Sequence, residues 1–171
     1  YGLVGFFVIL QTWFNLLDMG LTSTVIRESA RYLGGAVSVD AFLRLFRSLE
    51  ILFSVVAATG MLVIFLLSGA IADSWLNVQE LDPEAVEYAI KLMAVIVATR
   101  WVSGLYRGLI SGFEHQVWRS GFNAAFSSMR FVGVLPVLAF IDATPKAYFT
   151  YQFLIAFIEL TVLLLKSGSF V

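Results

Sequence analysis

The chain is poor in the residues on which most soluble enzymes depend. It has no cysteine, one histidine, three prolines and only 13% charged residues. Without cysteine there is neither a disulfide scaffold nor a thiolate metal site. The net charge of −1 gives no basic patch, so we expect no nucleic-acid partner. H-E-x-x-H, P-loop and nucleophile-elbow motifs are also missing. We therefore predict no enzyme activity, no catalytic residue, no metal and no cofactor.

Apolar residues dominate instead. They make up 60% of the 171 residues, and the mean hydropathy is +0.89. A soluble domain is typically ~45–50% apolar and ~25% charged, so we predict an integral membrane protein. A membrane helix needs about 20 mostly apolar residues. The expected fold is an all-α, polytopic transmembrane bundle over residues 1–171, with about five helices at approximately 1–17, 42–71, 82–113, 117–141 and 144–165.

Helix-capping residues and the charges of the loops refine this predicted fold. Ser38, Asp82-Pro83 and Thr144-Pro145 are expected helix caps. Arginines concentrate between the first two helices, and acids between the next two. By the positive-inside rule, loops 22–41 and 114–116 are expected to be cytoplasmic and loop 73–87 outside. Because the chain begins at Tyr1 inside an apolar run, we also expect it to be a piece of a longer protein.

Polar residues in four of these stretches recur at steps of three, four and seven, which places them on one helix face. Such stripes are costly in lipid and normally face a bundle interior or an aqueous cavity. The stripes predict a transport pathway lined by polar side chains. They comprise Gln11, Asn15, Asp18 and Thr22; Arg100, Ser103, Arg107 and Ser111; Gln116, Arg119, Asn123, Ser127 and Arg130; and Tyr148, Gln152, Glu159 and Lys166.

Two arginines are expected deep in the membrane. Arg100 lies about 18 Å into its helix at ~1.5 Å per residue, and Arg130 is similarly deep. A central arginine costs at least ~2.5 kcal/mol and requires partners or water. One interpretation is that both hold an anionic phosphate or pyrophosphate, which a guanidinium binds bidentately. The alternative is an internal ion pair with Glu159, Glu50 or Asp18.

The remaining charges near this region are expected closer to the cytoplasm. Arg107 and Arg119 are interpreted first as topology determinants or headgroup contacts, and Arg107 is also included among the candidate pyrophosphate ligands. Glu159 is expected to pair with Arg100 or Arg130, with ion coupling as the alternative. Glu50 is expected to pair with Arg47 one turn away.

Glycine and proline predict local features. Gly104, Gly108 and Gly112 repeat every four residues, and this spacing favours close helix packing. Gly20 predicts a break after the first span, with a helix resuming over residues 22–32. Pro136 predicts a kink in the fourth span.

Two stretches resemble a known family. They are "YGLVGFFVILQTWFNLLDMGLTSTVIRESARY" at residues 1–32 and "LYRGLISGFEHQVWRSGFNAAFSSMRFVGVLPVLAF" at residues 105–140. Both resemble polysaccharide flippases, specifically the O-antigen (Wzx-type) branch of the multidrug/oligosaccharidyl-lipid/polysaccharide exporter superfamily. The distinctive pieces are residues 17–21 followed by Arg27-Glu28, and residues 106–108 followed by Gly112.

The resemblance implies a function and a place for the chain. The chain would be helices two to six of one six-helix lobe, with the second lobe missing and half a cavity present. The whole transporter would flip undecaprenyl-pyrophosphate-linked oligosaccharide across the bacterial inner membrane for O-antigen and lipopolysaccharide synthesis. Its partners would be the lipid-linked oligosaccharide, membrane lipid, the rest of the transporter and a glycan polymerase. The site residues are our own interpretation and not part of the resemblance: the cavity would be lined by Gln11, Asn15, Asp18, Ser103, Asn123, Ser127, Gln152 and Glu159. Of these, Gln11, Asn15, Asn123, Ser127 and Gln152 would form a hydrophilic path for the sugars.

Two other functions stay open. A cation-coupled multidrug exporter of the same superfamily would depend on its acids rather than on its arginines. A membrane enzyme of glycan assembly would depend on Glu114 or His115, the only adjacent acid–histidine pair.

Overall fold

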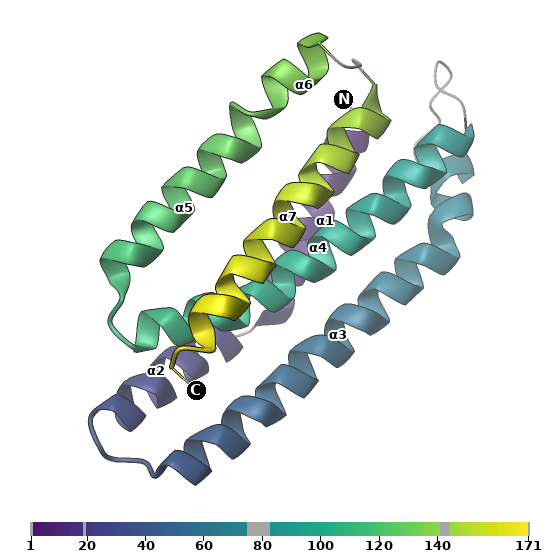
Figure 1. Ribbon diagram of the computed structural model, residues 1–171. Helices are drawn as coiled ribbons and strands as arrows, with labels where there is room; N and C mark the ends of the chain where they lie inside the picture. The colour runs from purple at the N-terminus through teal and green to yellow at the C-terminus, as the bar shows by residue number, and fades with distance from the viewer. Residues whose placement is uncertain (1, 19, 75–82, 141–143, 171) are drawn as a thin grey trace.

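The structure is a computed structural model that describes residues 2–18, 20–74, 83–140 and 144–170. These residues contain no strand, so the all-α prediction is confirmed. Figure 1 shows them as a bundle of inclined helices. The elements are α1 (Gly2–Asp18), α2 (Leu21–Leu33), α3 (Val39–Ser74), α4 (Pro83–Gly112), α5 (Gln116–Phe131), α6 (Val134–Phe140) and α7 (Pro145–Ser167).

Four stretches of the described chain are long and apolar enough to cross a membrane: Val39–Ala72, Glu84–Gly112, Gln116–Phe140 and Pro145–Ser167. Helices α1 and α2 meet this condition only as a pair, which bends by 47°. The number of spans is therefore four, or five if that pair crosses once. Helix α3 has 36 residues. At about 1.5 Å per residue it is longer than the ~30 Å hydrocarbon layer, so it must tilt or extend beyond that layer.

The expected caps are present where the structure describes them. The Ser38 hydroxyl accepts from the Ala41 amide at 3.4 Å, one residue before α3 begins. The Thr144 hydroxyl accepts from the Ala147 amide at 3.3 Å, and Pro145 opens α7. Helix α4 begins at Pro83, whereas the expected cap Asp82 lies outside the described residues. The first turn of a helix leaves backbone amides without a partner. A capping side chain accepts from one of them, and a proline has no amide hydrogen that would need a partner.

Helix α4 is the centre of the bundle, in contact with α1, α2, α3, α5 and α7. Its side chains Ala89, Ile90 and Met93 are fully buried. The other helices surround it and leave large apolar side chains such as Leu66, Phe140 and Leu165 exposed. In a membrane this arrangement places lipid against the outer helices and shields α4. A charged residue in the middle of α4, such as Arg100, therefore faces protein or a cavity.

Helix α2 packs against the glycine stripe of α4, formed by Gly104, Gly108 and Gly112. This confirms the packing prediction. A Cβ on Gly108 would lie 3.2 Å from Thr22, and a Cβ on Gly112 would lie 2.3 Å from the Ser29 Cβ. The same Cβ on Gly112 would lie 2.7 Å from the Ile26 carbonyl oxygen. Only hydrogen at these positions lets the two backbones approach so closely. The expected helix after Gly20 is also present, and Gly20 itself has φ 89°, a value that favours glycine.

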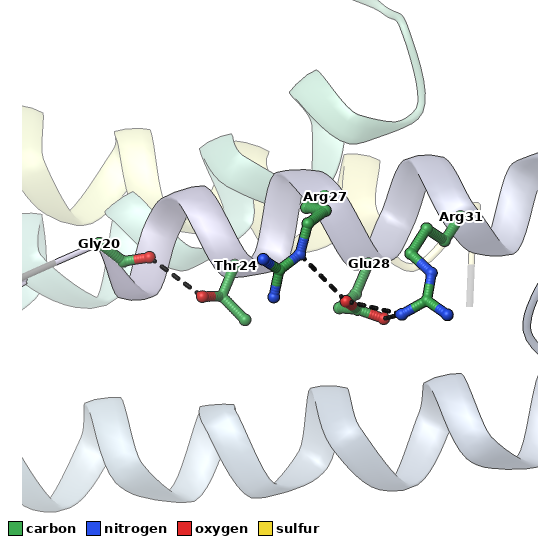
Figure 2. A network of polar contacts seen from close by, with 5 residues as sticks. All are labelled: Gly20, Thr24, Arg27, Glu28 and Arg31. Carbon is green, nitrogen blue, oxygen red and sulfur yellow. Dashed lines mark hydrogen bonds and ion pairs between the residues drawn. The ribbon is translucent and has the colours of Figure 1, made fainter.

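The outward face of α2 carries a small charge network, shown in Figure 2. Glu28 accepts from Arg27 at 3.2 Å and from Arg31 at 3.0 Å. The Arg27 and Arg31 side chains are 69% and 54% exposed, whereas that of Glu28 is 11% exposed. Because both arginines are largely exposed to solvent, these pairs contribute little to stability. The network therefore orders the face of α2 and leaves one surplus positive charge there.

The predicted kink in the fourth span is a break between α5 and α6. The Gly133 amide donates to the Ser128 carbonyl at 3.3 Å, one residue further back than in a regular α-helix. The Met129 carbonyl instead accepts from the Tyr151 hydroxyl of α7 at 2.6 Å. Pro136 follows three residues later and has no amide hydrogen to donate. The break thus results from a proline and from a tyrosine on a neighbouring helix.

Charge is distributed unequally between the two ends of the bundle. In Figure 1, α2, the α4–α5 turn and the C-terminus share one end, and the end of α3, the start of α4 and α6 share the other. Among the described residues, the first end carries the cations Arg27, Arg31, Arg44, Arg47, Arg119 and Lys166 and the acids Glu28, Asp40, Glu50 and Glu114. The second carries Glu84 and Glu87 together with Lys91 and Lys146. The predicted topology depends on this separation, and the side of the membrane stays a prediction.

Candidate functional site

Three helices meet at one buried carboxylate. Glu159 of α7 is 1% exposed, and its Oε2 accepts from Arg130 of α5 at 2.7 Å. Its Oε1 forms an ion pair with Arg107 of α4. Both carboxylate oxygens are therefore engaged, each by a different helix. Removing charges from water is costly, so a buried pair is maintained only when the geometry satisfies both partners.

A second contact lies next to this cluster. The Arg100 guanidinium donates to the Gln152 side-chain oxygen at 2.8 Å and lies over the Phe7 ring at 5.5 Å. The Gln152 amide nitrogen in turn donates to the Arg130 carbonyl at 3.2 Å. Within the described ranges no carboxylate forms an ion pair with Arg100. Neutral groups thus hold Arg100, and its positive charge is not compensated by an acid.

These arginines border a cavity of about 190 Å³, which we call the arginine cavity. Helices α1, α4 and α5 enclose it. Three guanidinium groups and two carboxamides face it, and among its described lining residues there is no carboxylate. The lining consists of Gln11, Phe14, Asn15, Val97, Arg100, Trp101, Arg107 and Arg130. Glu159 and Gln152 lie behind this lining and fix its arginines. A cavity with this composition attracts anions.

A second cavity adjoins the first at Arg107. It has a volume of about 300 Å³ and lies between α2, α4 and α5, near the α4–α5 turn. We call it the turn-side cavity. Its lining consists of Thr22, Ile26, Gly104, Arg107, Gly108, Ser111, Arg119 and Asn123. Gly104 and Gly108 contribute no side chain, which leaves room beside the Thr22 hydroxyl.

The structure brings most of the predicted site residues together. Gln11, Asn15, Arg100, Arg107 and Arg130 line the arginine cavity, and Asn123 lines the turn-side cavity. Gln152 and Glu159 contact the arginines from behind, as described above.

Three predicted lining residues border neither cavity. The Ser103 hydroxyl donates to the Thr99 carbonyl at 2.9 Å, a common bond of a serine within a helix. The Asp18 carboxylate accepts from the Thr22 hydroxyl at 2.7 Å. Ser127 is exposed on α5. Ser103 and Asp18 find local partners because short polar side chains reach backbone or side-chain groups one turn away.

The alternative of an internal ion pair has a different outcome for each arginine. Arg130 pairs with Glu159, as that alternative required. Arg100 pairs with none of the three acids considered, because Glu50 pairs with Arg47 at 2.6 Å and Asp18 bonds Thr22. The expected Arg47–Glu50 pair is confirmed, and the Tyr106 hydroxyl also donates to Glu50 at 2.7 Å. Arg107 also contacts Glu159, a partner that the sequence interpretation did not assign to it.

The sequence prediction missed the apolar part of the lining. Phe14, Val97 and Trp101 border the arginine cavity, and Ile26 borders the turn-side cavity. Polar periodicity carries no signal for such residues, because an apolar side chain in a membrane helix is equally suited to lipid. The role of Phe7 beneath Arg100 was missed for the same reason.

The pair that a membrane enzyme would need lies at the surface. Glu114 and His115 form the turn between α4 and α5, and both are exposed. Glu114 has φ 63°, and the His115 ring lies 4.9 Å from the Phe170 ring. Neither residue lines the arginine cavity or the turn-side cavity.

Comparisons of the chain with protein-family models, curated proteins and solved structures find no match.

Proposed function

We propose that the chain is part of a membrane transporter that moves a lipid-linked oligosaccharide across the bacterial inner membrane and binds its pyrophosphate group in the arginine cavity. The observation that carries this proposal is the cluster of Arg100, Arg107 and Arg130 on one cavity between membrane-length helices. Arginine in a low-dielectric site binds phosphate oxygens strongly and bidentately.

The size of the cavity supports binding of a headgroup rather than of a whole glycan. A volume of about 190 Å³ is below the ~300–1,000 Å³ of ordinary small-molecule pockets. A pyrophosphate suits this space, whereas a chain of sugars requires more. In the proposed transporter, the sugars would extend toward the rest of the protein along Gln11 and Asn15, and the polyprenyl tail would stay in lipid.

The rival exporter would bind a cation through its acids. At this site the described carboxylate is that of Glu159, which is 1% exposed and already engaged by two arginines. A cation therefore meets positive charge before it reaches an accessible acid. This electrostatic argument favours an anionic substrate over a cationic drug.

Arg100 provides the sharpest test because its removal leaves no buried carboxylate without a partner. In cells that depend on this protein for surface glycan, we expect Arg100→Gln to reduce surface glycan at least tenfold. The lipid-linked precursor should accumulate at the cytoplasmic leaflet, measured by leaflet-specific labelling. The matched control is Arg44→Gln, which removes the same charge from an exposed position on α3.

Three results would count against the proposal. Normal export in Arg100→Gln, at wild-type protein level, would contradict pyrophosphate binding by this side chain. Normal export in Arg130→Gln combined with loss in Glu159→Gln, with both variants at wild-type protein level, would favour the cation-coupled rival. Loss of product on changing Glu114 or His115, with the glycan still made in detergent, would favour an enzyme.

A further inference from the structure

A second cation stands apart from the cluster around Glu159. Arg119, on the first turns of α5, is partly buried and lines the turn-side cavity. One of its terminal nitrogens donates to the Ser111 hydroxyl at 2.5 Å, which fixes the guanidinium against α4. Ser111 is itself held, because its hydroxyl donates to the Arg107 carbonyl at 2.7 Å. The position of Arg119 is thus determined by two successive hydrogen bonds.

Arg119 resembles Arg100 in its electrostatic state. No acid of the described ranges pairs with it, and its side-chain partner is a neutral hydroxyl. Arg107 and Arg130 are both paired with Glu159, and Arg130 lines the arginine cavity together with Arg100. Each cavity is thus lined by one arginine without an acidic partner and by Arg107, whose charge Glu159 partly neutralises. Arg107 borders both cavities.

From this arrangement we infer that the turn-side cavity is a second pyrophosphate-binding station, used before or after the arginine cavity. This inference rests on the proposed function. Arg119 and Arg107 supply charged donors, and the Asn123 amide supplies a neutral one. These are the donor types that phosphate oxygens accept from.

The shared side chain gives the two stations a physical connection. Arg107 reaches Glu159 on one side and lines the turn-side cavity on the other. An anion moving from Arg119 toward Arg100 therefore keeps contact with a cation throughout. Without such continuity, the anion would cross a region of low dielectric without a counter-charge, which is costly. Arg107 is thus positioned to transfer the pyrophosphate between the stations.

The test is a titration of inorganic pyrophosphate into the full chain, reconstituted in discs of phosphatidylcholine and followed by calorimetry. Wild type should show two classes of site. We expect Arg119→Gln to weaken one class at least tenfold and leave the other unchanged. Arg100→Gln should do the converse, and the exposed control Arg44→Gln should retain both. Arg119→Lys, which keeps the charge but not the planar fork, should bind with intermediate strength.

The failures of the two proposals can be distinguished. If Arg119→Gln binds pyrophosphate as wild type does while Arg100→Gln is impaired, the second station is refuted and the proposed function stands. If wild type binds no pyrophosphate, both are refuted. Discs that also contain phosphatidylglycerol test whether a phospholipid headgroup binds in the turn-side cavity instead. Loss of the Arg119-dependent class in those discs, with less phospholipid co-purifying with Arg119→Gln, would assign the cavity to bulk phospholipid and overturn the inference.

Discussion

Arg130 and Glu159 lie 29 residues apart in the chain, yet a hydrogen bond of 2.7 Å joins them. The carboxylate is 1% exposed, and Arg107 engages its other oxygen. The contact therefore joins α4, α5 and α7 at the back of the arginine cavity. It both orders the arginines and neutralises part of their charge.

Replacing this carboxylate should destabilise the fold. Glu159→Gln leaves two partly buried guanidinium groups without a counter-charge, and breaking a buried pair typically costs about 3–5 kcal/mol. Thermal unfolding in detergent, followed by tryptophan fluorescence, measures the effect. The control is Glu87→Gln, whose side chain is 38% exposed and pairs with Lys91. It should cost under ~1 kcal/mol. Equal shifts for the two variants would show that the Glu159 cluster is not a structural support.

Changing Gln152 tests the charge of Arg100 without removing the arginine. Gln152→Glu keeps the shape of the side chain but places a carboxylate at the oxygen that Arg100 contacts at 2.8 Å. We expect pyrophosphate binding in the arginine cavity to weaken at least tenfold, because the added acid competes for the guanidinium. Gln152→Met, which removes the hydrogen bonds without adding charge, should weaken binding less. The reverse order would mean that positioning matters more than charge. Calorimetric titration measures both.

The glycine stripe provides a pair of matched substitutions. In Gly112→Ala the new methyl group would lie 2.3 Å from the Ser29 Cβ, so α2 must move away from α4. Overpacking of this kind typically costs about 1–3 kcal/mol. In Gly121→Ala, on α5, the methyl group meets nothing within 4 Å, and stability should be unchanged or rise by up to ~1 kcal/mol. Thermal unfolding of the two variants side by side checks this. A neutral Gly112→Ala would contradict the close α2–α4 packing.

The break between α5 and α6 depends on Tyr151. Tyr151→Phe removes the hydroxyl that donates to the Met129 carbonyl at 2.6 Å. One lost hydrogen bond should cost about 1 kcal/mol. We expect faster amide hydrogen exchange over residues 132–135, because α7 no longer holds that turn. Exchange should be unchanged in α3, which packs against α2 and α4. Unaltered exchange over residues 132–135 would show that Pro136 alone is enough to cause the break.

Much of the fold follows from patterns that act within one helix. The length and apolarity of the spans, the caps at Ser38 and Thr144 and the contribution of Pro136 to the kink are local properties. Each depends on backbone donors, fixed dihedral angles or transfer into lipid. For the same reason the polar stripes indicated which faces point inward. Lipid penalises a charge on any other face, so Arg100, Arg130 and Glu159 had to face the interior.

The choice of partners is not local. A stripe defines a direction from the helix axis, but not which neighbouring helix lies in that direction or at what height. Glu159 was expected to pair with Arg100 or Arg130, and it pairs with Arg130 and Arg107. Arg100 bonds Gln152 instead. These outcomes depend on the rotation and depth of α4, α5 and α7 relative to one another.

The amino-acid sequence by itself determined that this is an all-helical membrane protein with inward polar faces, because burial in lipid acts on each segment separately. Only the tertiary structure decided that two arginines share one carboxylate while Arg100 and Arg119 keep uncompensated charges beside two adjoining cavities. Charge compensation depends on distances of a few ångströms between side chains on different helices, and packing around α4 sets those distances.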